Sequence, residues 1–165
     1  MPNASSWSFS EDDSRRIDDI LKSFLGDASA RTALIVDRTG QLVATVGEPV
    51  QFDPTAFASL TAADFSANDQ LARMLGEPEF GALFHQGERE SMYLADIARR
   101  VILVVLFDNS TTLGLVKLRV RNAVTQLNTV FTDMFSRADQ GVASPKVETG
   151  FLGDAEDEID RLFGA

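Results

Sequence analysis

The sequence predicts a mixed α/β protein, an α+β sandwich in which a five-stranded antiparallel sheet carries helices on both faces. First, segments with a helical apolar period alternate with short β-rich runs, in the order helix-strand-strand-helix-strand-strand-strand-helix. Second, short turns join neighbouring β-rich runs, which indicates hairpins and therefore antiparallel pairing. Third, residues 101–107 are apolar at every position, which is typical of a central strand covered on both sides.

The first helix is expected to begin after Ser10, because Asp13 follows three residues later as in a capping box. Gly26 is expected to end it. Residues 1–9 are expected to be a disordered N-terminus. Residues 33–36 and 41–46 then predict the first hairpin, since a Gly-containing turn separates them. The apolar stripe of this first helix consists of Ile17, Ile20, Leu21, Phe24 and Leu25.

The second helix is expected to begin at an Asp53 cap followed by Pro54, and to continue to Leu75 before Gly76. Helical geometry predicts a core-facing sector that contains Phe57, Leu60, Ala67, Leu71 and Leu75. Asp64 also falls inside this sector. The same geometry predicts an outward face that contains Ser59, Ala62, Ser66, Gln70 and Arg73. Most of these outward side chains are short, whereas a plain exposed helix more often carries Lys and Glu. We therefore predict that this face contacts a partner.

Three further strands are expected at residues 79–86, 91–97 and 100–107, followed by a long helix that starts near Leu113 and ends near Ala138. The folded domain is thus expected to span residues 10–138. Residues 139–153 have the composition of a flexible linker. Residues 154–165 form an acidic amphipathic segment whose large apolar residues share one helical face: Ile159, Leu162 and Phe163. This pattern is typical of a helix that docks in a groove, and the alternative is a disordered solubilising tail.

Composition excludes several classes of function. The 165 residues contain 15 Lys+Arg and 25 Asp+Glu, a net charge of −10, which disfavours binding to nucleic acid or anionic membranes. The chain has no cysteine and one histidine, so neither thiolate zinc sites nor histidine metal clusters are expected. Phosphate-cradling glycine motifs are absent, and no cofactor is expected. The longest apolar run is far shorter than the roughly 20 residues of a membrane span, so we expect a cytoplasmic protein without membrane insertion.

Two groups of residues have competing interpretations. His85 would suit a general base, but no partner stands at a recognisable spacing, and we favour a structural or exposed histidine. Arg99 and Arg100 close a predicted hairpin, where basic residues commonly protect sheet edges. An arginine there would alternatively suit a phosphoryl-transfer site as an arginine finger. We expect no catalytic residue in the isolated chain.

Several stretches resemble the roadblock (dynein light chain) family and, more closely, its bacterial MglB branch. The most specific stretch is FDNSTTLGLVKLRV at residues 107–120. Two others are VDRTGQLVATVG at 36–47 and SLTAADFSANDQLARMLGEPEF at 59–80. The segment DEIDRLF at 157–163 resembles the branch's C-terminal helix. The resemblance implies the roadblock, or profilin-like, fold.

The resemblance also implies a function. Members of the branch are homodimers that bind a small Ras-like GTPase, MglA, and stimulate its GTP hydrolysis in bacterial cell polarity or gliding motility. They reposition the GTPase's own arginine and glutamine instead of supplying a catalytic group. The third strand and second helix commonly pair across the dimer. There are two alternative functions: a non-catalytic scaffold for the GTPase, and a nucleotide exchange factor that acts through the C-terminal segment. A role in polarity would also imply that the protein is concentrated at a cell pole.

Site residues follow from the same resemblance. Ser66 and Gln70 match positions of the branch's partner-contacting helix, and helical geometry adds Ala62 and Arg73. The C-terminal segment would contact the GTPase at a second surface through Ile159, Leu162 and Phe163.

Overall fold

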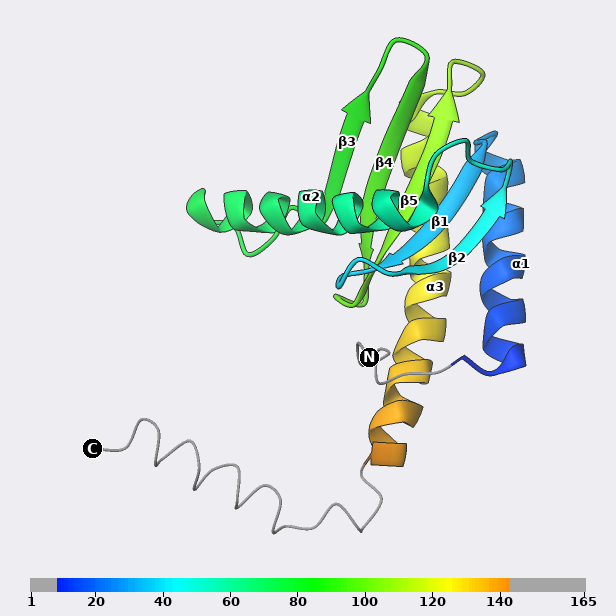
Figure 1. The fold of residues 1–165 in the computed structure, drawn as a ribbon, viewed down its shortest axis with the longest axis vertical. Helices are drawn as coiled ribbons and strands as arrows, with labels where there is room; N and C mark the ends of the chain where they lie inside the picture. The colour runs from blue at the N-terminus through cyan, green and yellow to red at the C-terminus, as the bar shows by residue number, and fades with distance from the viewer. Residues whose placement is uncertain (1–8, 143–165) are drawn as a thin grey trace. The chain divides into compact units, whose positions relative to one another are not determined.

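Helices and strands follow one another in the predicted order in the computed structural model, which describes residues 9–142, with the backbone alone for residues 140–142 (Figure 1). The elements are α1 (Glu11–Ala28), β1 (Thr32–Asp37), β2 (Leu42–Gly47), α2 (Pro54–Met74), β3 (Ala82–Gln86), β4 (Glu90–Ile97), β5 (Val101–Asp108) and α3 (Leu113–Val142). Phe9–Thr132 forms one compact unit, whereas residues 133–142, the end of α3, belong to a second.

The five strands form one antiparallel sheet in the order β2-β1-β5-β4-β3. The strand that is apolar at every position, β5, lies between β1 and β4, where Val105 pairs with Ala33 on one side and Tyr93 on the other. The five residues from Val101 to Val105 are buried, which confirms the prediction of a central strand. Consequently β2 and β3 are the two edges of the sheet, and β3 has a free edge within the described residues.

Helices cover both faces of the sheet. In Figure 1, α2 crosses in front of the strands, while α1 and the part of α3 in the same unit lie behind them. The core under α2 contains Leu34, Val36, Ala58, Ala62, Phe65, Leu94, Ile102 and Val104. On the opposite face, Phe84 of β3 stacks on Phe107 of β5 with ring centroids 6.1 Å apart. The predicted α+β sandwich is therefore confirmed.

Helix and strand ends differ from expectation by three residues or more at three places. The capping box at Ser10 is confirmed, because its hydroxyl accepts from the Asp13 N–H at 3.1 Å and its own N–H donates to Asp13 Oδ2. However, α1 continues past Gly26 to Ala28, since Ser29 adopts the left-handed conformation (φ 53°) that closes the helix. Similarly, β3 starts at Ala82 rather than residue 79, directly after Gly81 with φ 75°. The third difference is at the end of α3, four residues beyond Ala138.

The predicted linker at 139–153 overlaps this end of α3, because neither Asp139 nor Gln140 breaks a helix. The predicted segments 1–9 and 154–165 lie outside the described residues, apart from Phe9. The domain boundaries therefore stay predictions. None of the described helices is both long enough and apolar enough to span a membrane.

Candidate functional site

The face that α2 turns to the sheet differs from the one that its large apolar residues predicted. The buried residues are Ala58, Thr61, Ala62, Phe65, Asn68, Asp69 and Ala72. Leu60, Leu71 and Leu75, which were expected in the core, are 71%, 56% and 75% exposed, whereas Phe57 of the same predicted sector packs against the core. The prediction was wrong because α2 has two apolar stripes, and the one with small alanines lets the helix lie close to the crowded sheet. The leucine stripe is left on the outside.

Three of the predicted partner-contacting residues of α2 face solvent and one does not. Ser66, Gln70 and Arg73 are exposed. Ala62 is only 7% exposed and belongs to the core cluster under α2, so its predicted outward position is wrong. Its small side chain serves the close packing of α2 on the sheet. The contact made by the other three residues stays a prediction.

The remaining predicted contacts, Ile159, Leu162 and Phe163, lie outside the described residues. The candidate site in the structure therefore consists of the exposed side of α2 and its surroundings. This side has two parts. We call Ser59, Ser66, Gln70 and Arg73 the polar flank, and Leu60, Leu71 and Met74 the apolar flank.

Arg38 fixes the polar-flank side of α2 to the sheet. It extends from the turn after β1, and its Nη1 donates to Asp69 Oδ2 on α2 at 2.7 Å, while its Nη2 bonds to Asp96 on β4. The guanidinium also lies over the Phe65 ring, 5.1 Å from the centroid. Burial by itself would lower the pKa of Arg38, but the hydrogen bonds to Asp96 and Asp69 outweigh it and leave the pKa raised. The charged pairs thus hold the guanidinium ionised and in place.

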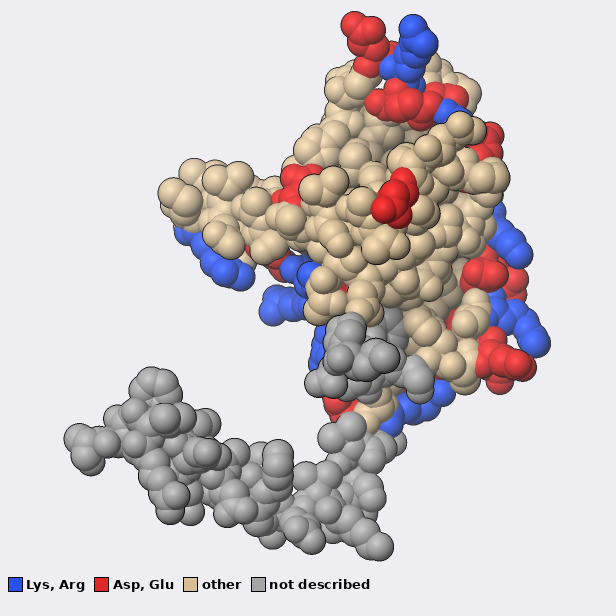
Figure 2. All heavy atoms as spheres, in the orientation of Figure 1, with Lys and Arg blue, Asp and Glu red and all other residues tan. Residues whose placement is uncertain are grey.

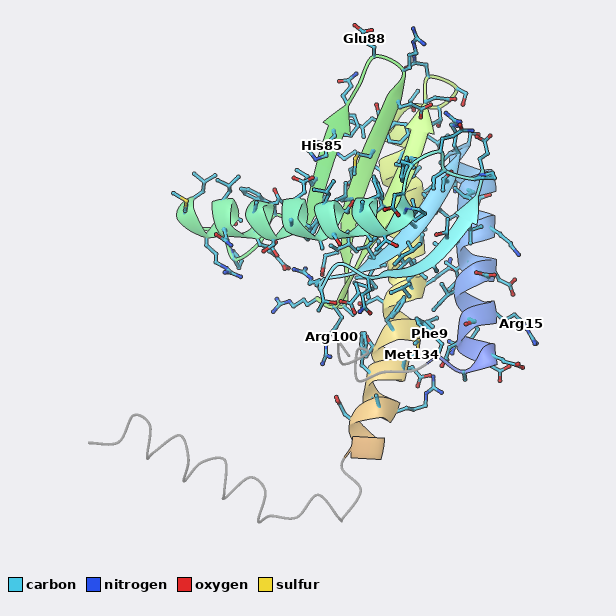
Figure 3. The ribbon with its side chains drawn as sticks, viewed as in Figure 1. Phe9, Arg15, His85, Glu88, Arg100 and Met134 are labelled. Carbon is cyan, nitrogen blue, oxygen red and sulfur yellow. The ribbon has the colours of Figure 1, made fainter. Side chains whose placement is uncertain are left out.

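His85 joins the other side of α2 to β3. Its Nε2 lies 2.6 Å from Asp64 Oδ2, with both side chains partly exposed (Figure 3). This pair explains why an acidic residue stands in the sector predicted to be apolar. The pair was not predicted from the sequence, although the isolated acid at position 64 was a signal that this sector did not face the core. His85 is a partly exposed, hydrogen-bonded histidine, in agreement with the interpretation favoured from the sequence.

His85 also lines an apolar cavity of about 540 Å³ between the β3–β4 hairpin and the segment before α2. Phe52, Met92 and Leu106 supply apolar walls, and Arg31 and Glu90 form an ion pair among the lining residues. In the part of the chain that the structure describes, no group of three or more His, Asp or Glu residues is placed to hold a metal ion.

Comparison with known proteins identifies the family. Residues 16–107 match the Roadblock/LC7 domain. The solved structure of MglB from Myxococcus xanthus is 40% identical in sequence, with a TM-score of 0.69, over 72% of this chain and 96% of that chain. The chain belongs to the Roadblock/LC7 family, on its MglB branch. The predicted family resemblance is thereby confirmed.

Two further MglB structures are similar to this roadblock protein. The gliding protein MglB from Thermus thermophilus is 31% identical, with a TM-score of 0.72, over 77% of this chain and 96% of that chain. A structure described as MglB with a tetrameric arrangement is 30% identical, with a TM-score of 0.75, over 79% of this chain and 98% of that chain. A profilin from Schizosaccharomyces pombe shares the fold alone, as the term profilin-like implies. It is 17% identical, with a TM-score of 0.53, over 68% of this chain and 97% of that chain.

Proposed function

We propose that this roadblock protein is a homodimer that binds a small Ras-like GTPase of the MglA type and stimulates its GTP hydrolysis. The observation that carries the proposal is the exposed polar flank of α2, in a chain 40% identical to a protein named MglB. Ser66 and Gln70 have short or uncharged side chains, which allow the backbone of another protein to approach closely. In this proposal the protein is a regulator in bacterial cell polarity or gliding motility, and it has no active site of its own.

Dimer formation would use the apolar flank and the free edge of β3. Leu60, Leu71 and Met74 are 56–81% exposed, and a row of large apolar side chains on one helix is typical of a protein contact. The edge strand β3 leaves backbone donors and acceptors unpaired within the described residues, so a second β3 could extend the sheet. Self-association through these two features would place two copies of α2 beside each other as a platform for the GTPase.

The proposed activation works by positioning. An arginine and a glutamine that belong to the GTPase would be brought into the geometry in which they stabilise the charge that develops on the transferring phosphoryl group and orient the attacking water. The roadblock dimer supplies a rigid surface against which the GTPase rearranges. Arg38, Asp69 and Asp96 contribute to that rigidity by fixing α2 to the sheet.

A double substitution tests where the GTPase binds. Ser66→Arg together with Gln70→Arg places two long charged side chains on the polar flank, so binding to the GTPase, measured by pull-down, is expected to be lost while the dimer remains. The matched control is Leu118→Arg, which changes an exposed residue of α3 on the opposite side of the sheet. Unchanged binding by the double variant would overturn the assignment of this flank.

A further inference from the structure

The two sides of α2 that meet the sheet face opposite ends of it. On the polar-flank side, Ser59 lies against Gly40 in the β1–β2 turn, and Asp69 bonds to Arg38 of the same turn. On the other side, Asp64 bonds to His85 near the β3–β4 hairpin. Because strands in this sheet alternate in direction, the β1–β2 and β4–β5 turns share one end, and the β3–β4 hairpin lies at the other. The polar flank therefore faces the end that carries the β4–β5 turn.

The β4–β5 turn holds an unusual backbone conformation. Ala98 and Arg99 are consecutive non-glycine residues with φ angles of 53° and 58°, in the left-handed region that L-residues seldom occupy. The Arg99 N–H donates to Asp96 Oδ2 at 3.1 Å, and the Arg100 N–H donates to the Ile97 carbonyl at 3.1 Å. Two left-handed residues in a row are the backbone that tight hairpin turns favour, and here the bonds to Asp96 and Ile97 hold non-glycine residues in it.

Asp96 connects this turn to α2. Its Oδ2 accepts from Arg99 while its Oδ1 bonds to Arg38, and Arg38 in turn bonds to Asp69 on α2. The Arg38 N–H also donates to the Arg100 carbonyl at 3.2 Å. The β4–β5 turn, the β1–β2 turn and the second half of α2 are thus tied together by one set of bonds. Arg99 consequently has a fixed backbone position relative to the polar flank.

The side chain of Arg99 is presented to solvent. It is 79% exposed, and its Nη2 lies 4.0 Å from Glu79 Oε1, which is a weak ion pair at the limit of contact. Arg73 is exposed on the adjacent flank. Lys and Arg side chains gather directly below α2 in Figure 2, and Figure 3 shows Arg100 at that end of the sheet, with Glu88 of the β3–β4 hairpin at the other.

We propose that Arg99 is a further contact residue for the GTPase, and that it binds a carboxylate on the GTPase surface beside the contact made by the polar flank. This inference rests on the proposed function. A guanidinium on a fixed backbone is suited to a carboxylate, because its planar donors match two oxygens and little backbone freedom is lost on binding. The partner's carboxylate would replace the distant Glu79. Arg73 and Arg99 then form the basic border of one surface that runs from α2 to the β4–β5 turn.

The test compares two charge reversals in the full chain. Arg99→Glu is matched by Arg89→Glu, which makes the same change at an exposed arginine of the β3–β4 hairpin, at the opposite end of the sheet. The probe is the cognate MglA-type GTPase loaded with a non-hydrolysable GTP analogue, and its dissociation constant is measured at low and high salt. Arg99→Glu is expected to weaken binding about tenfold at low salt and less at high salt, as for a charged residue at an interface border. Arg89→Glu is expected to leave binding unchanged.

Each other outcome overturns a separate statement. If Arg99→Glu and Arg89→Glu have the same dissociation constant for the GTPase while Ser66→Arg/Gln70→Arg does not bind it, the Arg99 contact is refuted and the proposed function stands. If the unsubstituted protein does not bind the GTPase, the proposed function fails, and the Arg99 contact fails with it. A third variant, Arg99→Ala, is added to the GTPase at a saturating concentration. If the GTPase then hydrolyses GTP more slowly than with the unsubstituted protein, the contact role is also refuted, since Arg99 would be a catalytic arginine.

Discussion

Replacing Arg38 by methionine tests the charged link between α2 and the sheet. Arg38→Met removes the 2.7 Å bond to Asp69, the bond to Asp96 and the position over Phe65. It leaves the two carboxylates, whose side chains are 12% and 14% exposed, without their cation. Two hydrogen bonds to charged groups contribute about 3–6 kcal/mol together before screening. Because 28% of the Arg38 side chain remains exposed, we discount this and expect unfolding to become easier by about 2–4 kcal/mol.

The assay is urea unfolding followed by circular dichroism at one fixed protein concentration, since self-association would make stability depend on concentration. Arg31→Met is the matched control, because Arg31 also bridges two carboxylates, Glu48 and Glu90, but at the surface. Its substitution is expected to have a much smaller effect. Changing Asp69 and Asp96 to Asn in the Arg38→Met background should restore part of the lost stability, because no buried charge is then left unpaired. Equal effects of Arg38→Met and Arg31→Met would refute the reasoning.

Three further changes have expected outcomes. Leu71→Glu with Met74→Glu should convert the proposed dimer to a monomer, because charges replace exposed apolar side chains. The molecular mass is measured by light scattering, and an unchanged mass would contradict the proposed interface. Gly47→Ala should reduce the unfolding free energy by about 2 kcal/mol or more in urea titrations, because Gly47 has φ +106° and an added Cβ would lie 2.4 Å from a backbone carbonyl oxygen. Gly26→Ala is the control and should not destabilise the protein, because the space around Gly26 is open. Equal stability of the two variants would refute this reasoning. Deletion of residues 154–165 should weaken GTPase binding in calorimetric titrations without unfolding the domain, and an unaltered affinity would deny this segment a role in binding.

The sheet was predictable from the sequence because its strands differ in pattern. Residues 101–107 are apolar on both faces, which only a central strand tolerates, and β5 is central. The hairpins follow from short turns between β-rich runs. Family resemblance agreed with these local patterns, so the element order and the layers could be predicted together.

The orientation of α2 could not be predicted from hydrophobicity. Alanines with Phe65 form one apolar stripe, and Leu60 with Leu71 forms another on the opposite side, so the larger side chains favoured the wrong face. Hydrophobicity does not distinguish a stripe that packs on the sheet from a stripe exposed for another protein. Asp64 was the one residue in the sequence that conflicted with the predicted orientation.

The Arg38 link was missed for a different reason. Its partners, Asp69 and Asp96, stand 31 and 58 residues further along the chain, and no local spacing brings such residues together. The left-handed backbone at Ala98 and Arg99 was equally hidden, because neither residue type signals that conformation. Both features depend on the pairing of β4 with β5 and on the crossing of α2 over the sheet.

Single-turnover GTP hydrolysis by the cognate MglA-type GTPase tests the central proposal most directly. The GTPase is loaded with GTP, and phosphate release is followed alone, with the roadblock protein, and with its Ser66→Arg/Gln70→Arg variant. We expect clear acceleration by the unsubstituted protein and none by the variant. Complex formation without acceleration would contradict activation and favour a scaffold, and faster release of bound GDP would favour nucleotide exchange.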